Sequence, residues 1–347
     1  MRKLLRIFIV VLPLERYAWH KIQMFSYFTF CMIQRVFLDF SGIYVKIIVY
    51  SLTIGVCFMY HVIVNPQGGK GKSLKALATV EETLKSKNIP YEVHKTEYPG
   101  HATEITRELS KNPDTVILMM GGDGSFNEIL NGIEDFDNVT LGILPCGTGN
   151  DFVKASGHPA NVKDALDVVL KNNVGHLDYI QLGDRRCLNV LGAGMDVDVL
   201  LKYAEMKAFH GKFKYYASLF YTLAHTRWHK LRFTLDDGEP MERSTFMIGI
   251  GNGKCIGGGM PICPNGIPDD GKLDVVIVNE MKKGRIPFEL PKFLKGKHVK
   301  RDFTEEYTAR KVKIEVLDDS KFEADGEVFD AKVIECEVIS NKLKVFR

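Results

Sequence analysis

The sequence has no pattern of paired cysteines. Its seven cysteines are scattered over 347 residues, are odd in number, and form no C-x-x-C pair. Such spacing indicates neither a disulfide framework nor a cysteine-based zinc site. A reducing cytosol is the natural compartment for such a chain, so we expect a cytoplasmic protein.

The sequence also lacks a strong charge of one sign. The net charge is +3, and it is unevenly spread, because residues 1–58 carry +5 and the remainder carries −2. Nucleic-acid-binding domains typically gather an excess of basic residues on one face. No nucleic-acid partner is therefore expected for the main body of the chain.

No hydrophobic run is long enough to cross a membrane. The longest uncharged run, "IIVYSLTIGVCFMY" at residues 47–60, has 14 residues, whereas a spanning helix needs about 18. Residues 1–58 form a hydrophobic, basic leader with three interpretations: a membrane-associating segment, a signal-like segment, or an artefact of the start site. We favour the third, with a folded protein that begins at Met59. The lack of a small-residue cleavage site makes a secretory signal the weakest of the three.

The hydrophobic pattern predicts an α/β protein with two domains. From residue 60 to residue 145 strands and helices alternate, and this order predicts a parallel sheet with right-handed crossovers. After about residue 177 the pattern changes to short strands separated by turns, interrupted by one helical stretch at residues 213–227. We predict an N-terminal parallel-sheet nucleotide-binding domain over residues 59–176 and a C-terminal, mainly antiparallel β domain over residues 177–347.

One glycine-rich turn, "GGDG" at residues 121–124, lies between a buried strand and an amphipathic helix. The carboxyl ends of parallel strands are where open α/β sheets bind ligands, and the amides of a helix N-terminus attract phosphate. Asp123 in this turn could hold a Mg2+ that bridges phosphate oxygens. A turn that merely needs positive φ, with Asp123 as a helix cap, explains this stretch equally well.

Two further glycine-rich turns follow strands, "NPQGGKGKS" at residues 65–73 and "PCGTGND" at residues 145–151. Three such turns at strand ends line one edge of one sheet, where they can face a single polyphosphate. The first is not a Walker A loop, because Pro66 stands where that motif requires glycine. Lys70 and Lys72 are either phosphate ligands or solvated charges. The combination favours nucleotide binding.

In this order and spacing, the three turns resemble the catalytic domain of the diacylglycerol kinase family, which includes bacterial soluble lipid kinases and sphingosine kinases. The resemblance covers essentially residues 59–347. Residues 250–278 resemble the glycine-rich loop and Asp-Asp-Gly turn of the family, and "ADGE" at residues 324–327 resembles its late Asp-Gly-Glu element. Ser125 replaces the usual threonine but keeps the hydroxyl group.

The resemblance implies a two-domain fold that binds ATP and Mg2+ between its domains and transfers a phosphoryl group to a lipid hydroxyl. It implies that Asp123 and Glu327 are catalytic, with Glu327 as the base, although a hairpin turn alone also explains "DGE". It also implies a Mg2+ near Asp270, with the backbone oxygens of Ile267 and Lys272. The implied nucleotide contacts are Asn65, Pro66, Gln67, Gly68, Gly69, Thr96, Gly122, Asp123, Gly124, Ser125, Asn127, Glu128 and Thr148.

The expected activity is that of an ATP- and Mg2+-dependent lipid kinase, with diacylglycerol as the expected acceptor. An NAD kinase-like phosphotransferase shares the GGDG turn but is disfavoured by "NPQGG" and "PCGTGND". An inactive lipid-binding regulator is disfavoured by the intact acidic residues. Peripheral membrane contact or ordinary core packing explains the aromatic side chains at Phe209, Phe213, Tyr215, Tyr216, Phe220 and Tyr221. The sequence leaves the choice of lipid and the formation of a homodimer open.

Overall fold

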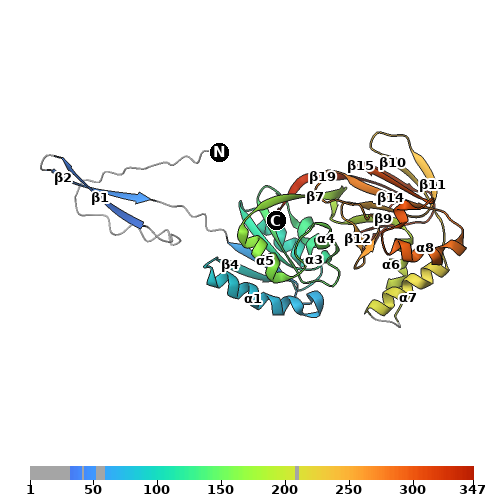
Figure 1. Ribbon diagram of the computed structural model, residues 1–347, viewed down its shortest axis with the longest axis horizontal. Coiled ribbons are helices and arrows are strands. Elements are labelled where there is room, and N and C mark those ends of the chain that lie inside the picture. The colour runs from blue at the N-terminus through green and yellow to red at the C-terminus, as the bar shows by residue number, and fades with distance from the viewer. Residues whose placement is uncertain (1–31, 41–42, 52–58, 208–210) are drawn as a thin grey trace. The chain divides into compact units, whose positions relative to one another are not determined.

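The structure is a computed structural model that describes residues 32–40, 43–51, 59–207 and 211–347 (Figure 1). The chain divides into two compact units, Met1–Cys57 and Phe58–Arg347. In the first unit, β1 (Met32–Phe40) and β2 (Ile43–Ser51) pair in antiparallel fashion, with Met32 opposite Ser51. The other residues of the predicted leader lie outside the described residues, so the role assigned to this segment stays a prediction.

The second unit begins with the predicted parallel sheet. Strand β3 lies between β4 and β5, and β6 pairs with the other side of β5. Helices α1 and α5 pack on one face, and α2 and α3 pack on the other, so the strands are apolar on both faces. The elements are β3 (Tyr60–Val64), η1 (Gly68–Lys70), α1 (Lys72–Ser86), β4 (Tyr91–Lys95), α2 (His101–Leu109), β5 (Thr115–Gly121), α3 (Asp123–Gly132), β6 (Val139–Pro145), α4 (Asp151–Ala155) and α5 (Val162–Lys171). The predicted strand-helix order is confirmed.

The C-terminal lobe is largely antiparallel, as predicted. Its core is formed by alternate residues of the paired strands, among them Leu191, Ile250 and Ile314, which are fully buried. The strands are β7 (Val174–Leu182), β8 (Arg185–Cys187), β9 (Val190–Gly194), β10 (His229–Leu235), β11 (Met241–Gly251), β12 (Cys255–Ile256), β13 (Met260–Pro261), β14 (Leu273–Asn279), β15 (Thr304–Ala309), β16 (Lys311–Val316), β17 (Phe322–Ala324), β18 (Glu327–Phe329) and β19 (Val333–Phe346). This lobe carries the second half of the predicted site.

Strands β7 and β19 connect the two lobes. Strand β7 crosses the predicted domain boundary at residue 177 without a break and pairs with β19 in antiparallel fashion. Strand β19 also pairs with β16, and near its end it lies parallel to β6, with Val345 opposite Leu141. The side chain of Phe346 is buried among α1, α5 and the parallel strands. The last strand of the chain therefore completes the N-terminal sheet.

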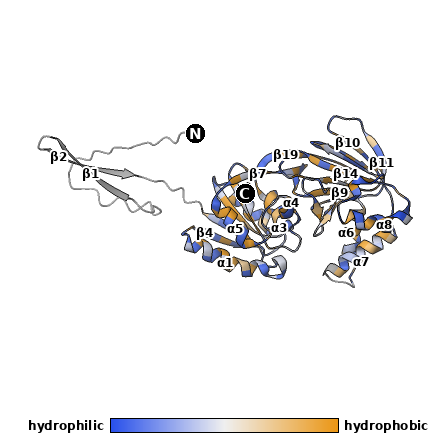
Figure 2. Ribbon diagram, in the orientation of Figure 1, coloured by the Kyte–Doolittle hydropathy of each residue, from blue (hydrophilic) through white to orange (hydrophobic). Residues whose placement is uncertain are grey.

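Among the described residues, the C-terminal lobe has three α-helices and the short 3-10 helices η2 (Lys283–Arg285) and η3 (His298–Lys300), whereas the sequence predicted one helical stretch. Helix α7 (Gly211–Ala224) corresponds to the predicted stretch and mixes hydrophobic and hydrophilic residues (Figure 2). Helix α6 (Met195–Glu205) was missed because "MDVDV" alternates like a strand, and α8 (Ile286–Phe293) was missed because it contains prolines. The described residues include no helix that is both long and apolar enough to cross a membrane.

Candidate active site

The three glycine-rich turns lie in direct backbone contact. Gly69 has a φ of 56°, and a Cβ at this position would clash with the carbonyl oxygen of Cys146. A Cβ on Gly147 would likewise clash with the Cα of Gly122. Because only glycine allows such close approach, these residues let the turns form one surface at the carboxyl ends of β3, β5 and β6.

The first turn is held together by Asn65. The side-chain oxygen of Asn65 accepts a hydrogen bond from the backbone N–H of Gln67 at 3.0 Å, and its carbonyl accepts one from Gly68 at 2.9 Å. The hydroxyl of Ser73 also donates to this carbonyl. Thr96 lies beside the turn, because its N–H donates to Val64 at the end of β3. These predicted nucleotide contacts therefore come together, with Gln67 exposed.

The second turn presents the N-terminus of α3. Its N-cap residue is Gly122, which has no side chain to bond the first amides of the helix, and Asp123 lies inside the first helical turn. The alternative in which Asp123 caps the helix is therefore wrong. Gly124 is exposed, and the Ser125 side chain lies close against Gly121. Uncapped amides at a helix N-terminus are a favourable binding place for phosphate.

Asp123 lies in a cluster of carboxylates. Burial raises the pKa of Asp123, hydrogen bonds from the backbone N–H groups of Asp151 and Phe152 lower it, and the charges of Asp151 and Asp325 raise it further. The Phe152 N–H lies 3.2 Å from the Asp123 carboxylate. Carboxylate oxygens with unbalanced negative charge are suitable ligands for Mg2+, so these residues fit the implied metal.

The third turn connects the two lobes. The buried carboxylate of Asp151 accepts a hydrogen bond of 2.6 Å from the N–H of Gly258, in the glycine-rich loop of the C-terminal lobe. Asn150 adopts a left-handed conformation with φ of 50° and donates to the carbonyl of Gly147 at 3.1 Å. Thr148 is exposed at the tip of the turn. The loop of the C-terminal lobe therefore lies directly on the glycine-rich surface.

Asp325, which sequence analysis did not single out, joins the late "ADGE" turn to the N-terminal lobe. Its carboxylate accepts hydrogen bonds from the N–H groups of Leu188 at 2.6 Å and Asn189 at 2.9 Å, and from the side-chain amide of Asn127 at 2.6 Å. The only signal in the sequence was its place beside Glu327. The side chain of Glu327 is 74% exposed and lies 3.7 Å from Arg185.

Glu128 faces away from the three turns. Its carboxylate accepts a hydrogen bond of 3.2 Å from the N–H of Ala102, in the first turn of α2, and its carbonyl accepts one from Thr103 at 2.9 Å. The side chain therefore stabilises the start of α2. Its nucleotide contact stays a prediction.

The predicted metal turn lies in the C-terminal lobe. Asp270 and Ile267 are exposed, and the carboxylate of Asp270 accepts a hydrogen bond of 3.0 Å from the N–H of Lys272. Burial and then the charge of Asp270 raise the pKa of Asp274 to about 6. The charge of Asp270 also adds to the effect of burial in raising the pKa of Asp178. Such excess negative charge fits a bound Mg2+, and the metal itself stays a prediction.

Family models match the two lobes in turn. Residues 59–182 match the diacylglycerol kinase catalytic domain, and residues 189–347 match the YegS C-terminal NAD kinase beta sandwich-like domain. The chain belongs to the diacylglycerol kinase family. It resembles a diacylglycerol kinase of Staphylococcus saprophyticus, with 29% identity over 273 residues that cover 77% of this chain and 88% of the relative. A diacylglycerol kinase of Mycobacterium tuberculosis is 28% identical over 294 residues, which cover 82% and 93% of the two chains.

Solved structures of the diacylglycerol kinase family have the same fold. A putative diacylglycerol kinase from Bacillus anthracis aligns with a TM-score of 0.70 and 24% identity, over 85% of this chain and 97% of that chain. A second structure described as a diacylglycerol kinase from the same organism aligns with a TM-score of 0.67 and 27% identity, over 83% and 96% of the two chains. The family models and the relatives assign this chain to a kinase family, the solved structures show its fold, and the acceptor stays open.

Two buried carboxylates lie beneath the "ADGE" turn of this family member. Asp196 and Glu323 both lie against Gly192, and Glu323 accepts a hydrogen bond of 2.8 Å from the N–H of Gly326. Burial raises the pKa of Asp196 to about 7, although the nearby His229 lowers it. Burial, followed by the charge of Asp196, raises the pKa of Glu323 well above its usual value. Both carboxyl groups are therefore favoured in their protonated, neutral form in the folded chain.

This pair predicts how stability depends on pH. Both carboxyls bind protons more tightly in the folded chain than in the unfolded one, where such groups have pKa values near 4. The free energy of unfolding should therefore decrease as pH rises from about 4 through about 7. Glu323→Gln should reduce this decrease, as measured by urea unfolding at several pH values. Glu337→Gln, at an exposed site on β19, is the control, and an unchanged profile in Glu323→Gln would contradict the assignment.

Proposed function

We propose that this kinase transfers the γ-phosphate of ATP to a lipid hydroxyl in a Mg2+-dependent reaction, with diacylglycerol as the acceptor. The single observation that carries the proposal is the 2.6 Å hydrogen bond between Asn127 and Asp325. This hydrogen bond brings the turn that precedes Glu327 against helix α3, which begins in the GGDG turn. A carboxylate near phosphate-binding amides is the arrangement that phosphoryl transfer to a hydroxyl requires.

The residues divide the chemical task between the lobes. The amides of the three glycine-rich turns bind and orient the phosphates of the nucleotide. Glu327, exposed at the start of β18, accepts the proton of the acceptor hydroxyl. When bound by Asp123, Mg2+ would supply charge neutralisation on the phosphate oxygens. Asp325 orients the turn that carries Glu327.

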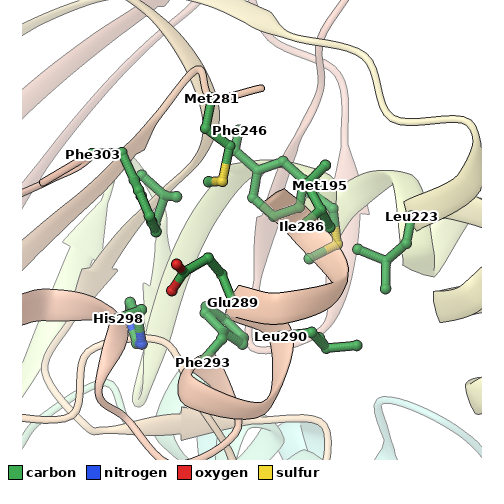
Figure 3. A pocket seen from close by; sticks show the side chains of 11 residues that line it. Met195, Leu223, Phe246, Met281, Ile286, Glu289, Leu290, Phe293, His298 and Phe303 are labelled. Carbon is green, nitrogen blue, oxygen red and sulfur yellow. The ribbon is translucent and has the colours of Figure 1, made fainter. Parts of the chain in front are cut away.

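We place the acyl chain of the acceptor at an apolar pocket in the C-terminal lobe. Side chains from α6, α7, α8 and the strands β11 and β14 surround it, as Figure 3 shows. Met195, Phe246 and Phe303 are largely buried there, and Leu223 comes from α7. Glu289 is the one acidic side chain among the lining residues, and Arg301 bonds it at 2.8 Å. An apolar lining with few polar groups is typical of a lipid or small-molecule site.

The same helices expose apolar side chains to solvent. On α7, Phe213 and Phe220 are 66% and 62% exposed, and on α8 Phe288 is 75% exposed. Tyr216 and Tyr221 are also exposed, whereas Tyr215 is partly buried. Phe209 lies outside the described residues. Helices α7 and α8 thus both line the pocket and expose aromatic side chains. These two features support our proposal that a cytoplasmic protein contacts a membrane surface through α7 and α8.

A phosphorylation assay tests the proposed function. Radiolabelled ATP with Mg2+ would be offered with diacylglycerol, monoacylglycerol, ceramide, a long-chain base, phosphatidylglycerol and NAD in separate reactions. We expect the label in phosphatidic acid. Label in NADP would favour the NAD kinase-like alternative, and no transfer to any acceptor, with lipid binding retained, would favour an inactive regulator.

Filling the pocket should shorten the acyl chains that the enzyme accepts. Leu223→Trp adds volume to a lining side chain, so kcat/KM for long-chain diacylglycerol should fall about tenfold or more. Activity on a short-chain diacylglycerol should be largely retained. Leu317→Trp, at an exposed position, is the control. Equal loss on both lipids, or no loss on either, would exclude the pocket as the acyl site.

A further inference from the structure

Two histidines and a glutamate lie together on the strands β3 and β4, away from the kinase residues. His61 lies opposite Glu92 across the parallel pair, and His94 follows two residues after Glu92. Because side chains alternate along a strand, the three project from the same face. The histidine side chains are only 15% and 19% exposed, and that of Glu92 is 58% exposed. The cluster is thus partly shielded but open to solvent on one side.

Three donor atoms of this cluster form a compact triangle. His61 Nδ1 lies 3.1 Å from His94 Nε2, and Glu92 Oε2 lies 3.6 Å from the first nitrogen and 3.7 Å from the second. A point at equal distance from these atoms lies about 2 Å from each, the length of bonds from Zn2+ to histidine nitrogen and carboxylate oxygen. Among the described residues, no other His, Cys, Asp or Glu group brings three donor atoms within 4.8 Å of one another.

The chemistry of the cluster suits a transition metal more than Mg2+. Imidazole nitrogens are common ligands of Zn2+, whereas Mg2+ prefers oxygen. A histidine ligand must be neutral, and burial lowers the pKa of both His61 and His94. The plain alternative is a hydrogen bond between two neutral imidazoles, which involves Glu92 only as a neighbouring charge.

We propose that His61, Glu92 and His94 form a binding site for one divalent transition-metal ion, with Zn2+ as the preferred occupant. Three protein ligands leave a fourth tetrahedral position for water. The ion would fix β4, which has no further strand beside it among the described residues, to β3. Asn65 and Thr96 directly follow these two strands, so the bound ion would also restrain the first glycine-rich turn. None of the three ligands is a residue to which the proposed kinase chemistry assigns a role.

Zinc titration of the full-length protein tests this site. After treatment with a chelator, the wild type should bind one more equivalent of Zn2+ by isothermal titration calorimetry than His94→Ala or His61→Ala does. His176→Ala, at an exposed histidine outside the cluster, should bind as the wild type does. Equal stoichiometry and affinity in the wild type and the cluster variants would overturn the proposal.

Two additions keep the test decisive if a histidine variant fails to fold. Glu92→Gln changes an exposed side chain and should weaken Zn2+ binding without altering the circular dichroism spectrum. Co2+ added in place of Zn2+ should produce the strong visible absorption of tetrahedral cobalt in the wild type and lose it in Glu92→Gln. Identical Co2+ spectra and Zn2+ affinities in these two proteins would show that Glu92 is not a ligand and would overturn the three-residue site.

Discussion

Glu327→Gln is expected to lower kcat by about 10²–10⁴-fold, the range that general-base catalysis contributes. Glutamine keeps the shape of the side chain but cannot accept the proton of the acceptor hydroxyl. Because Glu327 is exposed and its carboxylate pairs with Arg185 at 3.7 Å, a surface contact that contributes little to stability, the substitution should leave the fold intact. The affinity for ATP should stay nearly constant, since the side chain acts on the acceptor.

Steady-state kinetics with diacylglycerol and a separate ATP-binding measurement would check this expectation. Glu337→Gln removes an exposed carboxylate from β19 in the same lobe and should leave kcat unchanged. A parallel loss of ATP binding in Glu327→Gln would instead indicate a metal-binding or structural role. A kcat near that of the wild type would assign the base to another residue, with Asp123 as the next candidate.

Asp325→Ala is expected to lower the free energy of unfolding by about 3 kcal/mol or more. Its carboxylate bonds the backbone N–H groups of Leu188 and Asn189 and the side chain of Asn127, and alanine would leave all three donors without this partner. Leaving a buried donor unsatisfied costs about 1–3 kcal/mol for each group. Activity should also fall, because the turn that carries Glu327 would lose its attachment to the N-terminal lobe.

Urea unfolding combined with kinetics would measure both effects. Asp330→Ala is the matched control, because this aspartate lies three residues after "ADGE" in the same hairpin segment, is exposed, and pairs with Lys321 at 3.0 Å. An exposed ion pair contributes about 1 kcal/mol or less. If Asp325→Ala were no less stable than Asp330→Ala, the hydrogen bonds of Asp325 would not stabilise the contact between the "ADGE" turn and the N-terminal lobe.

The strands and helices of the N-terminal lobe could be predicted because each depends on residues that are close together in the sequence. The apolar run of β5, the glycines after it and the periodic apolar residues of α3 each follow from a few neighbouring residues. The meeting of the three turns also followed from the sequence, because parallel strands place their carboxyl ends along one edge. The structure adds the reason for particular glycines, such as the close approach of Gly147 to Gly122.

Contacts between distant segments could not be predicted in the same way. Asn127 and Asp325 are separated by 198 residues, and no local pattern relates an amide in one helix to a carboxylate in a late hairpin. The buried pair Asp196 and Glu323 is hidden for the same reason, since each is an ordinary acidic residue in its own segment. The cluster with His61 escaped notice because its ligands lie on two strands joined by a long crossover.

The placement of β19 has a consequence for how the protein is made. A ribosome releases residues 59–176 long before β19 emerges, yet Phe346 packs into the core of that lobe and Val345 pairs with Leu141. The nascent N-terminal lobe therefore exposes one edge of β6 and an unfilled part of its core throughout synthesis of the C-terminal lobe. This edge of β6 and this part of the core are covered only after β19 has been synthesised.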